Sequence, residues 1–173
     1  MKRVVTVHFP AGDSVTGMNN DKGWLGTPGK TLHTMSPSEL DAAKVEAESF
    51  FSAQLQQLFS ELKVERKEAF SGKEVYVVSG IRGTELPVDL YFEEESGLLV
   101  RLRHYTATPL GCNPMQIDYA AYRQEGTVKV PFRWTVSRPN GRFTIQIEQM
   151  HQNVPIPDDK FSMPTTDQPS SRD

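Results

Sequence analysis

The segment from Gly23 to Thr31, GWLGTPGKT, comes nearest to a chemical motif, because it ends like a nucleotide phosphate-binding loop. That loop needs a glycine five residues before the glycine of Gly-Lys-Thr. This position holds Trp24, and Gly23 stands one residue too early. The helix whose N-terminus would anchor a phosphate is predicted to begin only near Pro37. The segment therefore predicts a loop without a nucleotide.

The other reactive side chains of the sequence do not indicate a metal site or an activated nucleophile. The only cysteine, Cys112, cannot form an internal disulfide and has no neighbouring base in the sequence. The acidic runs at 93–95 and 158–159 fall in predicted turns, where carboxylates are solvated. No histidine has a second histidine or a cysteine at metal-ligand spacing, which applies to His8, His33, His104 and His151. We expect no enzymatic activity, no metal site and no cofactor in this chain.

A set of aromatic and aliphatic residues is the best candidate for a binding site. In one interpretation these side chains fill a core between a helix and a sheet. In the other they line a cavity for an apolar ligand. The spacing leaves both interpretations open. The set consists of Phe50, Phe51, Leu55, Phe59, Phe92, Phe132 and Trp134.

Composition limits the partners of the chain. Its 173 residues include 19 basic and 22 acidic ones, and the formal net charge is −3. Nucleic-acid binding would require clustered basic residues, so we expect none. The apolar runs are far shorter than the ~20 residues of a membrane-spanning helix. A chain of this length can nevertheless bury a core without disulfides.

The clearest local signal is a helix start at Ser36-Pro37-Ser38-Glu39. Serine at the N-cap, proline at the first helical position and glutamate three residues after the cap form a capping box. Apolar residues then recur at spacings of three and four. They predict a helical region over about 37–60, with a break near Phe51-Ser52.

Alternating apolar and polar residues predict strands on both sides of this helix. Before the helix we expect strands at 3–9 and 14–18 and a short one at 24–25. After it, strand 63–70 should pair with strand 74–81. Further antiparallel strands are expected near 86–93, 98–103, 116–123, 128–136 and 143–147.

The alternation also assigns side chains to the two faces of the sheet. Val88, Leu90 and Phe92 should share an apolar face. In the next strand, Leu98, Val100 and Leu102 should face one side, and Leu99, Arg101 and Arg103 the other. Charges on the polar face are expected to form cross-strand pairs. The residues concerned are Arg101, Arg103, Arg133, Arg142, Asp89, Asp118 and Glu148.

Helices and strands are segregated along the chain, which argues against a parallel α/β sheet. The predicted class is α+β, mainly β, with an antiparallel meander that carries the helical segment on one face. We expect one domain over residues 1–163, as part of a larger protein. The polar, proline-containing residues 164–173 are predicted to be a disordered tail.

The stretch from Val88 to Pro164 resembles the lipoprotein-carrier (LolA/LolB-like) superfamily. The resemblance rests on Leu90-Tyr91-Phe92 with Ser96 to Arg101, Asp118-Tyr119, Tyr122-Arg123, Gly126 to Phe132, and Asn153 to Ile156 with Phe161. Thr108 to Gly111 and Pro131 to Thr135 are similar to the C-terminal extension of multihaem proteins related to the photosynthetic reaction-centre cytochrome c subunit. The resemblance implies a half-barrel, which is a curved sheet holding helices in its concave face. It also implies a periplasmic or cell-envelope location.

Two functions from different classes follow. The first is a non-enzymatic envelope domain that binds a lipid or acyl chain between sheet and helices. The second is a structural or protein-interaction extension of a multihaem cytochrome-like protein, with a solid core. The chain contains no Cys-x-x-Cys-His, so any haem would belong to an upstream cytochrome-like domain.

Overall fold

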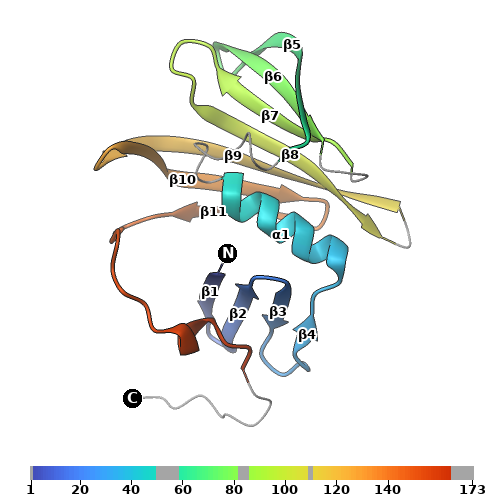
Figure 1. Cartoon of the computed structure of the whole chain (residues 1–173), viewed down its shortest axis with the longest axis vertical. Helices are drawn as coiled ribbons and strands as arrows, with labels where there is room; N and C mark the ends of the chain where they lie inside the picture. The colour runs from blue at the N-terminus through green and yellow to red at the C-terminus, as the bar shows by residue number, and fades with distance from the viewer. Residues whose placement is uncertain (1, 50–58, 82–85, 109–110, 165–173) are drawn as a thin grey trace. The chain divides into compact units, whose positions relative to one another are not determined.

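The computed structural model describes residues 2–49, 59–81, 86–108 and 111–164 (Figure 1). Four strands precede the only α-helix of these residues, and seven strands follow it. The elements are β1 (Lys2–Phe9), β2 (Gly12–Asn19), β3 (Lys22–Gly26), β4 (His33–Thr34), α1 (Pro37–Ser49), β5 (Glu61–Phe70), β6 (Lys73–Ile81), β7 (Val88–Glu93), β8 (Leu99–Thr108), β9 (Gly111–Glu125), β10 (Val128–Arg138), β11 (Gly141–Gln146) and the 3-10 turn η2 (Asp158–Phe161).

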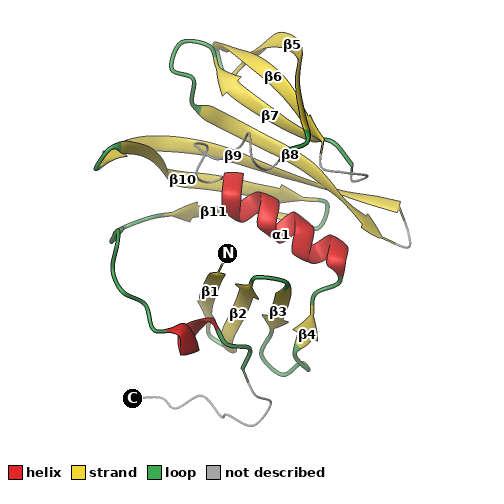
Figure 2. Cartoon of the chain, viewed as in Figure 1, coloured by secondary structure: helices red, strands yellow, loops and turns green. Residues whose placement is uncertain are grey.

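The strands form two separate antiparallel sheets (Figure 2). One has four strands in the order β1-β2-β3-β4, and the other has seven in the order β11-β10-β9-β8-β7-β6-β5. Both are open meanders in which every strand pairs with its neighbours in sequence. The mainly β class with one helix is therefore confirmed, whereas the single sheet that the sequence predicted is wrong. The curved half-barrel stays a prediction.

The chain divides into two compact units, residues 1–41 with 151–173, and residues 42–150. The four-stranded sheet belongs to the first unit and the seven-stranded sheet to the second. The expected single domain over 1–163 stays a prediction. Of the predicted tail, only Pro164 lies within the described residues, and it is exposed.

Trp24 dominates the core of the first unit. It lies on β3 directly opposite Gly17 of β2 and is 1% exposed. Any side chain at position 17 would overlap the indole ring, because a Cβ there would fall inside the ring's van der Waals envelope. The glycine thus provides the space that the tryptophan fills.

The capping box predicted at the start of α1 is confirmed. The Glu39 backbone N–H donates to Ser36 Oγ (3.3 Å), and the Ser36 backbone N–H donates to Glu39 Oε2 (2.8 Å). His33 Nε2 lies 3.1 Å from the same carboxylate. The helix is described as far as Ser49, and the rest of the predicted helical region, residues 50–58, lies outside the described residues.

The second unit has one main hydrophobic cluster, formed between the seven-stranded sheet and α1. Val45 of α1 and Phe59 contribute from the helical side. Phe59 packs flat against β6, since a Cβ on Gly80 would lie 2.6 Å from its ring. The buried members from the sheet are Val88, Leu90, Leu99, Leu102, Met115, Ile117, Tyr119 and Val136.

One strand differs from the alternation that its sequence predicted. Leu99 joins Leu102 in the main cluster, whereas Val100 packs on the other side of the sheet. The register between β7 and β8 shifts at this point, since Tyr91 pairs with Arg101 but Phe92 pairs with Leu99. A β-bulge adds one residue and so exchanges the faces of the residues before it. The predicted grouping of Val100 with Leu102 is wrong for this reason.

We expect Gly17→Ala to destabilise the first unit by about 2 kcal/mol or more, because the added methyl group overpacks the space under Trp24. Gly26→Ala is the matched control on β3, where a Cβ would make an ordinary contact at 3.5 Å. Chemical denaturation followed by tryptophan fluorescence measures both. Equal stability of the two variants would contradict the packing of Trp24 on Gly17.

The capping box predicts a pH-dependent contribution to stability. The Ser36 backbone N–H bonded to the carboxylate lowers the pKa of Glu39, with His33 adding to the effect. Because the folded-state pKa lies below the unfolded value of about 4.3, the stabilisation is present above that pH and is lost as the pH falls through the folded-state pKa. Glu39→Gln should therefore be less stable than the natural chain at pH 7 and equal to it near pH 3. A difference that does not change with pH would contradict this role.

Candidate functional site

A row of apolar side chains crosses all seven strands of the second sheet on the face that packs against α1, here called the helix-side face. Residues directly opposite each other in antiparallel strands share a face, so the row follows from the strand register. Its members, in order from β5 to β11, are Val64, Val78, Leu90, Leu102, Ile117, Val136 and Phe143.

Burial changes along this row. The middle is closed, with Leu102 fully buried and Ile117 4% exposed. Both ends are open, since Val64 is 61% exposed and Phe143 is 49% exposed. The apolar row is thus longer than the part that other side chains cover, and an apolar surface remains at each end.

The open end at β11 is widened by a second row. Tyr119, Trp134 and Ile145 are paired directly across β9, β10 and β11. Tyr119 is buried, whereas Trp134 and Ile145 are only partly buried. Phe143, Trp134 and Ile145 together therefore form an apolar surface at the β10–β11 end of the helix-side face.

Three of the predicted ligand-binding residues belong to this face. Phe59 is buried in the main cluster, and Phe92 and Trp134 pack against it. Phe132 is also buried, at 3% exposure, but lies outside the cluster, with the Arg123 guanidinium 4.3 Å from its ring centroid. Phe50, Phe51 and Leu55 lie outside the described residues. The ligand-binding role of the set stays a prediction.

The prediction passed over the aliphatic members of the row because the residues that it selected from the strands were all aromatic. Leu90 was already assigned to an apolar face by alternation, which is the signal that could have identified it. Leu102 and Phe143 required the strand register as well. A bulge and the relative alignment of neighbouring strands decide that register, and neither is visible in one strand's pattern.

Two polar groups lie at the border of the helix-side face. His104 of β8 is 3% exposed, and its Nε2 lies 3.4 Å from Glu46 Oε1 of α1 without a hydrogen-bond partner among the described residues. Tyr122 donates to the Leu99 carbonyl (2.5 Å), and burial raises the pKa of this phenol. His104 is thus adjacent to a helix carboxylate, whereas the Tyr122 hydroxyl is bonded to a backbone carbonyl.

The opposite face of the sheet, here called the outer face, carries a small apolar cluster of Val75, Val77 and Tyr91. Arg101 covers it, with its guanidinium 4.2 Å from the Phe70 ring centroid and 5.7 Å from that of Tyr91. Arginine can lie flat on aromatic rings while its charge remains paired. This cluster is thereby closed without a second layer of structure.

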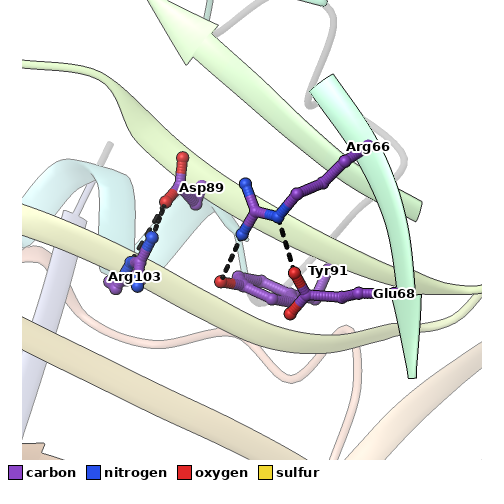
Figure 3. A network of polar contacts seen from close by, with 5 residues as sticks. All are labelled: Arg66, Glu68, Asp89, Tyr91 and Arg103. Carbon is purple, nitrogen blue, oxygen red and sulfur yellow. Dashed lines mark hydrogen bonds and ion pairs between the residues drawn. The ribbon is translucent and has the colours of Figure 1, made fainter. Parts of the chain in front are cut away.

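Two of the ion pairs on the outer face connect directly opposite residues, whereas Arg66 pairs with Glu68 on its own strand. Arg101 donates to Asp118 through Nε (2.5 Å) and through a terminal nitrogen (3.2 Å). Arg103 pairs with Asp89, and Arg66 donates to Glu68 and to the Tyr91 hydroxyl (Figure 3). The predicted cross-strand pairs of Arg101 and Arg103 are thus confirmed.

In the acidic run Glu93-Glu94-Glu95, only Glu93 differs from the solvated turn that the sequence predicted, because it is the last residue of β7, whereas Glu94 and Glu95 are exposed in a turn. Glu93 is 6% exposed and pairs with Lys73 and Ser96, and the Lys73 ammonium lowers the pKa of Glu93. Lys67 likewise lowers the pKa of Glu94. General acid–base catalysis needs neighbouring carboxyls whose pKa values are driven apart. Here both are lowered, and each carboxylate has its own lysine.

The described residues contain no group of histidine, cysteine, aspartate or glutamate side chains that could hold a metal ion. They also contain no helix that is long and apolar enough to cross a membrane. What the geometry offers is therefore apolar contact on the helix-side face and paired charges on the outer face.

Solved structures with similar folds include a LolA superfamily protein from Nitrosomonas europaea, with a TM-score of 0.55 and 16% identity, covering 94% of this chain and 76% of that one. The chain shares the fold of this LolA superfamily protein. A domain described as an outer-membrane lipoprotein-sorting protein, from Vibrio parahaemolyticus, has a TM-score of 0.51 and 12% identity, covering 92% of this chain and 80% of that one.

A DUF1329 family protein from Desulfovibrio piger is similar as well, with a TM-score of 0.51 and 12% identity, covering 87% of this chain and 68% of that one. Identities this low establish the fold alone. No protein-family model matches the chain, and no curated protein matches its sequence. None of the similar structures is described as a cytochrome, so that part of the resemblance stays a prediction.

The outer-face cluster predicts that Arg101→Lys destabilises the second unit by about 1 kcal/mol, since lysine cannot stack flat on two rings and bind a carboxylate with two nitrogens. Arg133→Lys is the matched control on β10, because Arg133 is exposed and should change stability by no more than about 0.5 kcal/mol. Urea denaturation of both variants measures the difference. Equal effects would show that Arg101 does not hold the cluster together.

Proposed function

We propose that this chain is a non-enzymatic cell-envelope domain that binds a lipid or acyl chain on the helix-side face, between the seven-stranded sheet and its helical cover. The observation that carries the proposal is the apolar row whose end at β11 is open. Phe143 is 49% exposed there, next to the partly buried Trp134. Large apolar patches left uncovered commonly mark binding sites.

The energetics fit an acyl ligand. Each methylene removed from water contributes about 0.8 kcal/mol. An acyl chain that buries roughly ten methylenes along the row would thus gain on the order of 8 kcal/mol before the costs of association are subtracted. Apolar contact alone could therefore retain such a ligand, without any charged anchor.

The similar structures support the class of ligand and the compartment. One belongs to the LolA superfamily, and another is described as an outer-membrane lipoprotein-sorting domain. A lipid-binding role in the envelope would suit the same fold here. The separate lysine partners of Glu93 and Glu94 support a binding role in preference to a catalytic one.

The second candidate is a structural or interaction domain, the proposed extension of a cytochrome-like protein. The closed middle of the row favours it, because Val45 and Phe59 already occupy the space over Leu90 and Leu102. In that case the open end at β11 would be a protein-contact surface. A ligand test therefore separates the two candidates.

Trp134 provides that test. Stearic acid dibrominated in mid-chain, added below its critical micelle concentration, should quench the Trp134 fluorescence in a saturable manner, because bromine quenches an indole at contact distance. Unbrominated stearic acid should compete with the quencher. Gently purified protein should also release a lipid detectable by mass spectrometry.

The chain contains its own control. Trp24 is 1% exposed in the other unit, so Trp134→Phe should abolish the quenching while Trp24 still emits. Phe143→Ser should weaken binding roughly tenfold or more without lowering stability, since Phe143 is half exposed. Quenching that persists in Trp134→Phe, or no saturable quenching in the natural chain, would refute acyl binding at this end of the row.

A further inference from the structure

At its turn end, the β8–β9 hairpin extends beyond the strands on either side of it. β7 last pairs with β8 at Arg103, and β10 last pairs with β9 at Gln116. Beyond these residues the two strands pair only with each other, from Tyr105 opposite Pro114 to Thr108 opposite Gly111. At about 3.3 Å per residue this two-stranded arm extends about 13 Å past the sheet, and Figure 1 shows it projecting beyond β7 and β10.

The arm has no charge. From residue 105 to residue 117 the sequence contains no Asp, Glu, Lys, Arg or His, although charged residues make up 24% of the chain. Its described residues are nevertheless mostly exposed, among them Tyr105 at 38%, and Cys112, Asn113 and Pro114. A projecting ribbon in water normally carries charges, so their absence indicates a less polar environment for the arm.

The opposite end of the sheet provides a comparison. There β9 and β10 project together, from Tyr122 opposite Pro131 to Glu125 opposite Val128. This second arm carries Arg123, Glu125 and Lys129 among its residues. The two ends of the sheet thus differ in charge, and the charged end also buries Val130 and Pro131.

Basic residues lie where the uncharged arm leaves the sheet. Arg138 donates to the Sδ atom of Met115 (3.1 Å), and Met115 is paired with His104 at the base of the arm. Arg142 lies opposite Ser137 in the next strand. Both arginines are exposed, and neither has a carboxylate partner among the described residues. A phospholipid bilayer has a neutral interior beneath a layer of phosphates. An uncharged projection would match the interior, and the exposed arginines at its base would match the phosphates.

We propose that the β8–β9 arm docks this protein on a phospholipid bilayer, with Tyr105, Cys112, Asn113 and Pro114 entering the headgroup region and with Arg138 and Arg142 at the phosphates. The inference deepens the proposed function, on which it rests, because a domain that binds acyl chains must meet the bilayer that supplies or receives them. Tyrosine is enriched at this depth of a membrane, and charged side chains are excluded from its interior.

Cys112, the only cysteine, allows the arm to be probed directly. An environment-sensitive nitrobenzoxadiazole label on Cys112 should brighten and shift to the blue when phosphatidylcholine vesicles are added. The same label on Gln124→Cys in a Cys112→Ser background, at an exposed position of the charged arm, should stay unchanged. No response at Cys112, or equal responses at both positions, would overturn the proposal.

A near-isosteric pair of charge substitutions tests the physical cause. Asn113→Asp should weaken vesicle binding, measured by co-sedimentation, by roughly tenfold, because it puts a carboxylate into the interface. Gln124→Glu in the charged arm should leave binding unchanged.

Added phosphatidylglycerol should strengthen binding through Arg138 and Arg142 at low salt. Binding that high salt abolishes, and that Asn113→Asp does not alter, would assign the contact to charge alone and refute insertion of the arm. Binding only to a protein partner, and not to vesicles, would do the same.

The two proposals can fail separately. Asn113→Asp should retain the saturable quenching of Trp134 by dibrominated stearic acid while it loses vesicle binding. If quenching is absent from the natural chain but the Cys112 label still responds to vesicles, acyl binding fails and the docking arm remains. If quenching is intact and the label does not respond, the docking arm fails and acyl binding remains.

Discussion

The register of the seven-stranded sheet is the constraint on which the rest of the second unit depends. Directly opposite residues share a face, so one aligned residue from each strand forms the apolar row from Val64 to Phe143. Such a row must be removed from water along most of its length if the sheet is to be stable. Val45 of α1 and Phe59 belong to the cluster that covers its middle.

The apolar side chains on the two faces of the sheet are covered in different ways. On the outer face, Arg101 covers Phe70 and Tyr91 with its guanidinium plane and pairs its charge with Asp118. The apolar groups are hidden and the surface remains charged, so nothing further needs to bind there. On the helix-side face, no arginine of the described residues stacks on Phe143 at β11, and an apolar surface remains exposed there. The contrast favours the helix-side face as the binding surface.

The two ends of the row are also not equivalent. At one end Val64 lies on β5, a strand rich in lysine, arginine and glutamate whose register shifts between Val64 and Arg66. Charges and bulges are the means by which an edge strand is kept from further association. At the other end β11 carries one charged residue, Arg142, and an alternating apolar face. An apolar partner is therefore expected at β11 and not at β5.

Sequence patterns predicted those features that one segment determines alone. Ser36 and Glu39 cap the helix as expected, because both hydrogen bonds of the capping box form within four residues. The faces of Leu90 and Phe92 follow from simple alternation. The division into two sheets did not follow, because alternation identifies strands but not their partners. The position of Leu99 could not be predicted either, since the bulge that exchanges it with Val100 depends on the alignment of two strands.

The same limit explains why the site was found only in part. Phe132 and Trp134 stand two residues apart in the same alternation, yet only Trp134 packs against the main cluster. Phe132 is buried elsewhere, with the Arg123 guanidinium over its ring. Alternation alone cannot distinguish the two residues, because it predicts the same face for both. Side-chain type and spacing identify candidate site residues, but their packing partners are known only from the structure. The projecting β8–β9 arm was likewise identified from the strand pairing.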